Sequence, residues 1–155
     1  MSKLTSFPNL SLARATRLGL AAVFGAIAWC AASATAWAQV SVHINKSSQT
    51  MNVTVDGSHY ATWSVSTARI GYRTPSGSFR AQRLEKMWYS RKYDMSPMPH
   101  SIFFLGGYAI HDTGYVRGLG RPASHGCVRL APANAATLFN LVRERGMRST
   151  RITIS

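Results

Sequence analysis

The first regular feature of the chain is an alternation of apolar and polar residues that begins at Val40. VSVHIN (40–45) and TMNVTV (50–55) alternate around the turn-like KSSQ, and Asp56-Gly57 leads into SHYATWSVST (58–67). Alternation with a period of two predicts half-buried strands, and Asp-Gly is a typical hairpin turn. The sequence therefore predicts a meander of antiparallel strands.

The middle of the chain gives weaker signals. Residues 69–79 are rich in Gly, Pro and Ser, which predicts a loop with a turn at 75–77. Residues 80–99 mix aromatic and basic side chains with little periodicity, and we expect a long, partly irregular segment. SIFFL (101–105) and GYAIH (107–111) are apolar enough for buried strands.

The last third of the chain predicts a loop, a helix and a strand. A glycine-rich loop runs up to Cys127. Pro132 suits a first helical position, and apolar residues share one face up to Gly146, which predicts a helix of about 14 residues. RITIS (151–155) then predicts a final strand.

The N-terminus has the pattern of an export signal. Lys3, Arg14 and Arg17 precede an uncharged stretch that runs from residue 18 to residue 42. Ala36-Trp37-Ala38 fits a signal-peptidase site, so we expect a signal peptide at 1–38 and one domain at 39–155. An uncleaved anchor is the alternative, and a lipoprotein anchor at Cys30 is less favoured because Trp29 precedes it.

The charge balance indicates anionic partners. The chain has 18 Lys and Arg, 5 Asp and Glu and a net charge of +13. Without the three basic residues of the predicted signal, 15 basic residues remain against all 5 acidic ones, a net charge of +10. Nucleic acid is the usual partner of such a chain, but an exported protein meets little of it. A carboxylate-rich polymer or an anionic membrane surface fits this location better.

Cys127 would be the one cysteine left after signal removal. An unpaired thiol in an exported protein is exposed to oxidation, although a small buried apolar role would also explain it. A nucleophilic thiol needs a base. His125 is two residues away, whereas His111, at the predicted end of another strand, can approach head-on and is favoured. Gly126 lets the loop adopt a positive φ so that successive N–H groups can bind one oxyanion.

A metal site is the competing chemistry, because His111, His125 and Cys127 are all legitimate zinc ligands. The zinc deaminases are the nearest pattern, but they need a second cysteine and a glutamate that are missing here. We therefore favour a thiol site without metal. The other histidines, His43, His59 and His100, are expected to be ordinary polar residues of strands or loops.

Four segments together carry a family resemblance: TPSG (74–77), MP (98–99), IH (110–111) and GRPASHGCVRL (120–130). In this order they resemble the catalytic domain of the L,D-transpeptidases, the YkuD-like family. A histidine followed, after a spacer, by Ser/Thr-His-Gly-Cys is specific to that family. The resemblance implies a mostly β fold, a mixed β-sandwich with one packed C-terminal helix.

The resemblance also implies roles for individual residues. Cys127 matches the nucleophile and His111 the general base, while His125 and Gly126 match residues that shape the oxyanion hole and pocket. In the family a backbone carbonyl orients the base, and here it would come from Asp112, where glycine is common. The Asp112 side chain could itself orient His111 or face solvent, and in either case we expect it to favour the imidazolium.

Further residues are expected to contact substrate. Arg121 and Arg129 are candidates to bind substrate carboxylates, and Ser124 belongs to the motif beside the nucleophile. Tyr72 and Trp88 could line the donor groove, although aromatic residues more often belong to a core.

The implied activity is acyl transfer in peptidoglycan, with no cofactor. The thiolate would attack the bond between the stem diamino acid and D-Ala, and an amine of a second stem or of an envelope protein would accept the acyl group. The alternatives are an L,D-carboxypeptidase, with water as acceptor, and a non-catalytic wall-binding module. We expect a monomer in the periplasm or cell envelope that a carbapenem acylates.

Overall fold

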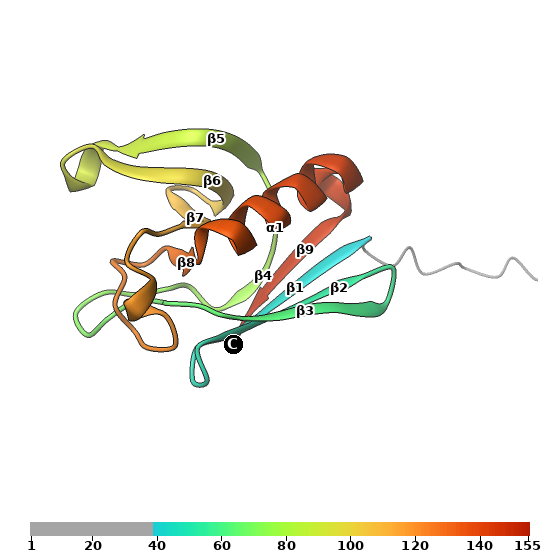
Figure 1. Cartoon of the computed structure of the whole chain (residues 1–155), viewed down its shortest axis with the longest axis horizontal. Coiled ribbons are helices and arrows are strands. Elements are labelled where there is room, and N and C mark those ends of the chain that lie inside the picture. The colour runs from blue at the N-terminus through green and yellow to red at the C-terminus, as the bar shows by residue number, and fades with distance from the viewer. Residues whose placement is uncertain (1–38) are drawn as a thin grey trace, which may run out of the picture. The chain divides into compact units, whose positions relative to one another are not determined.

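The structure, a computed structural model, describes residues 39–155. It contains two β-sheets and one α-helix, so the predicted mostly β fold is confirmed (Figure 1). The predicted signal peptide and the alternative anchor at 1–38 lie outside the described residues. Within 39–155, no helix has the length and hydropathy needed to span a bilayer.

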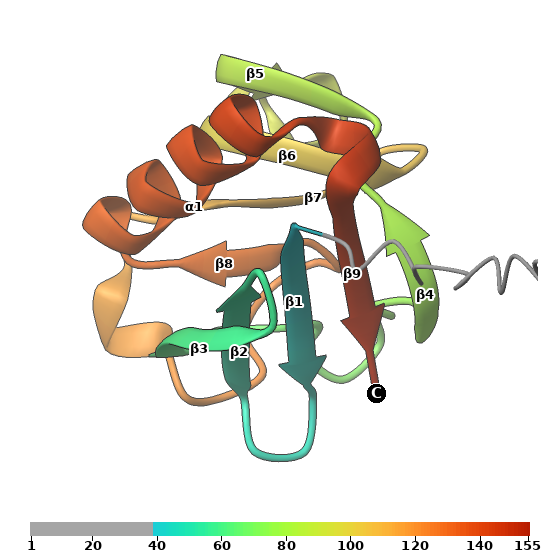
Figure 2. The ribbon, with the colours of Figure 1, turned by 90° about the vertical axis from the view of Figure 1, so that its right-hand side faces the viewer.

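The first sheet has five strands in the order β3-β2-β1-β9-β4. The predicted meander is present as three antiparallel strands, and the C-terminal strand pairs in parallel with β1 (Figure 2). The strands are β1 (Val40–Asn45), β2 (Thr50–Val55), β3 (Ser58–Ser64), β4 (Gly77–Arg80) and β9 (Thr150–Ile154).

The second sheet has four strands in the order β5-β6-β7-β8, of which only β7 and β8 are parallel. A 3₁₀ turn, η1 (Arg91–Tyr93), forms the tip of the β5–β6 hairpin. Two further 3₁₀ turns are η2 (Val116–Gly118) and η3 (Met147–Ser149). The strands are β5 (Arg83–Ser90), β6 (Ser96–Leu105), β7 (Tyr108–Asp112) and β8 (Val128–Leu130).

The β5–β6 hairpin corrects the expectation of an irregular segment at 80–99. Most side chains of β5 are exposed or half-buried, so burial does not alternate along it as in β1 or β2. A strand with no fully buried face has no period-two pattern. The hairpin is instead specified by its antiparallel pairing with β6.

Helix α1 (Pro132–Arg145) has the predicted bounds, with Pro132 in its first turn and Gly146 as its C-cap. It joins one core cluster with the inner residues of both sheets. Leu138 and Val142 are fully buried there, together with Ile110, Val128 and Ile152.

The two faces of the second sheet differ, and this difference positions the site. Alternate residues of its strands, such as Ile110 and Val128, belong to the main core with α1. The intervening residues point to the other face, where Phe103 and Ala109 form a small cluster with Cys127. The outer face of this sheet is therefore where chemically active side chains can meet a cavity.

Candidate active site

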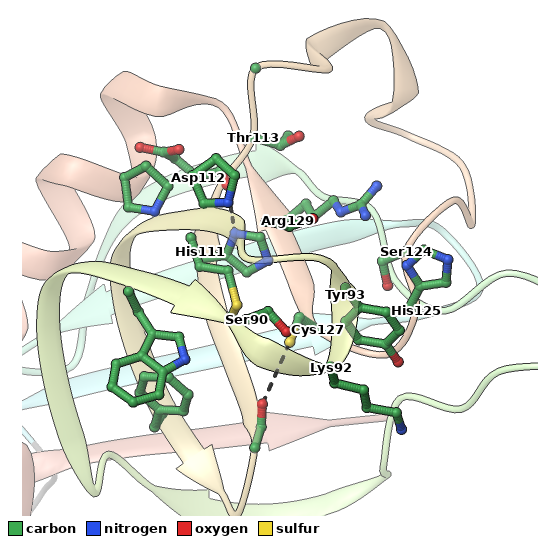
Figure 3. Close-up of a pocket in the computed structure, with 18 of the residues that line it drawn as sticks. Ser90, Lys92, Tyr93, His111, Asp112, Thr113, Ser124, His125, Cys127 and Arg129 are labelled. Carbon is green, nitrogen blue, oxygen red and sulfur yellow. Dashed lines mark hydrogen bonds between the residues drawn. The ribbon is translucent and has the colours of Figure 1, made fainter.

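Parallel pairing of β7 and β8 brings His111 and Cys127 to the same face of the sheet. His111 is in register with Arg129, and Cys127 immediately precedes β8. Residues two apart on a strand share a face, so Cys127 and Arg129 lie beside His111. Figure 3 shows the imidazole and the thiol facing one cavity.

The ring of His111 is held in one tautomer. Its Nδ1 lies 2.6 Å from the backbone oxygen of Asp112, and only 7% of the residue is exposed. A carbonyl oxygen can only accept, so Nδ1–H donates and Nε2 keeps its lone pair. Burial lowers the pKa of His111 from 6.5 to about 4; the bond to Asp112 opposes this shift and Arg129 adds to it. Near neutral pH the ring is therefore an uncharged base.

The side chain of Asp112 does neither of the things expected from the sequence. It is 8% exposed rather than facing solvent, and its Oδ2 lies 3.1 Å from Nδ1 of His100. Successive side chains of a strand point to opposite faces, so this carboxylate cannot orient the His111 ring directly. The expected shift of His111 toward imidazolium is also wrong, because burial determines the direction. Asp112 thus bonds to His111 through its backbone carbonyl and not through its side chain.

Cys127 is a partly buried thiol. Its Sγ lies 3.8 Å from the backbone oxygen of Gly107 (Figure 3), and the side chain packs against the Phe103–Ala109 cluster. Burial raises the pKa of the Cys127 thiol, while a backbone hydrogen bond from Ala109 and the charge of Arg129 lower it. Together with the low pKa of His111, this favours a neutral thiol beside a neutral imidazole over an ion pair.

The loop before Cys127 is tightly fixed. Gly126 has φ +131°, and its N–H donates to Oγ of the fully buried Ser124 at 3.0 Å. Its oxygen accepts from Oγ1 of Thr74 at 2.8 Å. The N–H of Gly126 is therefore not available to an oxyanion, contrary to the sequence-based expectation. The N–H of Cys127 has no partner among the loop hydrogen bonds of residues 39–155 and is the better candidate.

The ring of His125 forms a wall of the site between two tyrosines. It stacks on Tyr93 of η1 with ring centroids 4.7 Å apart and meets the edge of Tyr72 at 4.6 Å. Burial, Arg69 and Arg129 all lower the pKa of His125. This packing joins the hairpin tip to the loop that carries the thiol.

The structure separates the two candidate arginines. Arg129 lines the cavity beside Cys127, and its Nη1 donates to the oxygen of Ala123 at 3.3 Å. Arg121 is exposed and is not part of the cavity lining; it donates to the hydroxyl of Tyr115, which lines the cavity, and to the backbone oxygen of Arg117. Only Arg129 is placed to contact a group bound at the thiol.

The family can now be assigned. Residues 39–154 match the model of the L,D-transpeptidase catalytic domain, YkuD. The chain belongs to this family. The resemblance inferred from the sequence is therefore confirmed.

Solved L,D-transpeptidases share the fold. The L,D-transpeptidase from Mycobacterium smegmatis is 24% identical with a TM-score of 0.67, and the match covers 76% of this chain and 58% of that one. The L,D-transpeptidase from Stackebrandtia nassauensis is 25% identical with a TM-score of 0.67, and the match covers 76% of this chain and 55% of that one. L,D-transpeptidase 3 from Mycobacterium tuberculosis, solved with a faropenem-derived adduct, is 19% identical with TM-score 0.67, covering 76% and 60%. The chain thus spans less than two thirds of their length. None of the curated proteins matches it.

The cavity of this L,D-transpeptidase domain has a volume of about 640 Å³ and a strongly basic lining. Arg129 and Trp88 were named as candidates from the sequence, but Trp88 was the only one named from the β5–β6 hairpin. The other hairpin residues in the lining are Arg83, Ser90, Arg91, Lys92, Tyr93, Ser96, Pro97, Met98, Pro99 and Phe103. The basic and aromatic mixture at 80–99 was the available signal.

His111, His125 and Cys127, the ligands of the alternative zinc site, do not form a set in the structure. Across residues 39–155, no group of three His, Cys, Asp or Glu side chains is gathered closely enough to hold a metal ion. His125 instead packs between tyrosines, and Nδ1 of His111 is used by Asp112. The donor atoms present suit proton transfer to and from a thiol.

Proposed function

We propose that this protein is an exported peptidoglycan L,D-transpeptidase that uses Cys127 as its nucleophile. The observation that carries the proposal is the pairing of a cavity-facing thiol with a buried imidazole whose Nε2 is unprotonated. A neutral imidazole can take a proton from the thiol as the thiol attacks.

In the first half-reaction, Nε2 of His111 accepts the Cys127 proton while Sγ attacks the carbonyl between the stem diamino acid and D-Ala. The N–H of Cys127 is a candidate donor to the oxyanion. The C–N bond then breaks, His111 returns its proton to the departing D-Ala amine, and a thioester remains. His111 is neutral again at this point.

In the second half-reaction, an amine attacks the thioester and His111 takes its proton. The C–S bond breaks, the proton passes to the thiolate, and a new amide is formed. The basic cavity supports a carboxylate-bearing acceptor, because Arg129, Arg83 and Lys92 line it while Asp112 is its single acidic residue. A second peptide stem has such a carboxylate beside its amine; an envelope protein amine is the other acceptor.

An L,D-carboxypeptidase, with water as acceptor, would use the same first half-reaction. The test is to give the purified protein tetrapeptide-bearing muropeptides and to separate the products by mass. We expect 3–3 cross-linked dimers with some tripeptide, and neither product from Cys127→Ser. Tripeptide alone at high muropeptide concentration would assign the carboxypeptidase.

A non-catalytic wall-binding module is the alternative from another class, and a carbapenem separates it. The M. tuberculosis relative was solved with a faropenem-derived adduct. We expect a carbapenem to acylate Cys127, because its strained lactam presents an activated carbonyl to the thiol. Intact mass should show one adduct, absent from Cys127→Ala. A protein that binds wall fragments but forms no adduct would be the binding module.

A further inference from the structure

His100 and Asp112 form a contact at the edge of the active site, where Asp112 belongs to the cavity lining. Nδ1 of His100 lies 3.1 Å from Oδ2 of Asp112, with side-chain exposures of 28% and 11%. A carboxylate can only accept, so Nδ1–H of His100 is the donor. The imidazole also packs against Phe139 of α1, with ring centroids 5.7 Å apart. Three elements, β6, β7 and α1, therefore meet at this pair.

Asp112 is the residue whose carbonyl orients the base. It ends β7, and the chain then enters the loop that leads to η2. The next N–H, of Thr113, donates to the oxygen of Leu130 at 2.9 Å and holds one side of this carbonyl's peptide unit. The bond from His100 is the one side-chain hydrogen bond to the Asp112 carboxylate within residues 39–155. It anchors the residue from the other side.

The backbone at His100 is in an uncommon conformation. Its φ is +50° within β6, in the left-handed region that residues with a Cβ rarely adopt. Such conformations persist where the surrounding structure enforces them, and they gather at functional sites. Its neighbour Ser101 is fully buried and donates to the oxygen of Met98 at 2.8 Å. The fold therefore holds His100 in this conformation, from which its ring reaches Asp112.

We propose that His100 is a positioning residue for His111. By holding the Asp112 carboxylate, it fixes the carbonyl that keeps the proton of His111 on Nδ1 and leaves Nε2 facing the thiol. It contacts neither substrate nor Cys127. The effect of His100 on turnover rests on the proposed function, whereas its effect on the tautomer of the His111 ring does not.

The test combines His100→Phe, which keeps an aromatic ring against Phe139 but loses the donor, with His100→Gln, whose amide can donate. His43→Phe is the matched control, since His43 lies on β1 in the other sheet. Loss of positioning should lower kcat for the tetrapeptide substrate about ten-fold in His100→Phe with KM unchanged, because misplaced catalytic groups are costly. His100→Gln should recover much of this loss, and His43→Phe should behave as wild type.

A double variant tests whether the effect passes through the base. If His100 acts through His111, adding His100→Phe to His111→Ala should cause no further loss. Additive losses, or a His100→Phe kcat equal to wild type, would overturn the proposal.

Nitrogen NMR of the His111 ring tests the positioning without any turnover. Wild type should show the Nδ1–H tautomer alone, whereas His100→Phe should show a mixture of tautomers. An unchanged tautomer in His100→Phe would overturn the proposal, even if wild type proved to have no transpeptidase activity. If His100→Phe does not fold, Asp112→Asn, which weakens the same hydrogen bond, is judged by the same signals.

Discussion

Nδ1 of His111 lies 2.6 Å from the backbone oxygen of Asp112, which makes Nε2 the basic nitrogen beside Cys127. The low pKa of His111, about 4, and the raised pKa of Cys127 share one main cause, burial. The Cys127–His111 pair is thus uncharged at rest, and the proton moves only when the thiol reacts.

This uncharged resting state predicts the pH dependence of thiol labelling. A raised Cys127 pKa means that thiolate accumulates only above the ordinary range of a cysteine. The iodoacetamide rate should therefore be low at pH 7 and keep rising beyond pH 9. A rate that reaches its plateau near pH 6 would indicate a thiolate–imidazolium pair and contradict this assignment.

His111 also predicts a dependence of stability on pH. Its pKa is about 4 when folded and near 6.5 when unfolded, so the unfolded chain binds the proton first as pH falls. The contribution of the His111 ring to the free energy of unfolding is fully present above pH 6.5. It is lost progressively toward pH 4, and the loss amounts to about 3 kcal/mol. Urea unfolding at both pH values measures this loss, and His111→Gln should reduce it. An equal loss in the variant would assign the effect to other groups.

Gly126→Ala should damage both stability and activity. A Cβ there would lie 2.8 Å from Cε1 of Tyr108 and 2.9 Å from the oxygen of Arg73, at φ +131°. A contact with backbone cannot be relieved by a side-chain rotation, so we expect a loss of about 1–3 kcal/mol. Gly71→Ala is the control, since φ is +85° there but no atom lies within 4 Å. Thermal unfolding of both variants separates the two effects, because Gly71→Ala has backbone strain alone and Gly126→Ala has strain and crowding.

Two arginine variants test the acceptor side of the cavity. Arg129→Ala should shift products from cross-linked dimer toward tripeptide, because the acceptor carboxylate loses a cationic partner beside Cys127. Arg121→Ala should leave the ratio unchanged, since the Arg121 side chain is not part of the cavity lining. The same dimer-to-tripeptide ratio in both variants would remove Arg129 from acceptor binding.

The main elements of the fold could be predicted because their burial alternates. The strands at 40–45 and 50–55 and the helix from Pro132 each have one buried face, and that face is visible as a pattern of apolar residues. Strand β3 has no buried residue, and the Asp56-Gly57 turn before it was the available signal. Strand β5 was missed because none of its side chains is fully buried, whereas the second half of β6, with Ile102 and Phe104 in the core, was predicted as a buried strand. The place of the β5–β6 hairpin over the site comes from strand pairing, which no local pattern records.

The candidate site likewise has features that the sequence indicates and features that arise only in the folded protein. The motif around Cys127 and the strand end at His111 are local features, so the sequence could indicate them. The contact between His100 and Asp112 depends on how β6 pairs with β7, including the irregularity between Phe103 and Leu105. The burial that lowers the pKa of His111 likewise comes from the whole fold.

The most direct test of the central claim is to trap the acyl-enzyme. Purified protein is mixed with a tetrapeptide-bearing muropeptide, quenched in acid within one turnover and weighed intact. We predict a thioester adduct with the mass of the muropeptide minus D-Ala, located on Cys127 by peptide mapping and absent from Cys127→Ala. Product formation by Cys127→Ala, or an adduct on any other residue, would contradict the account.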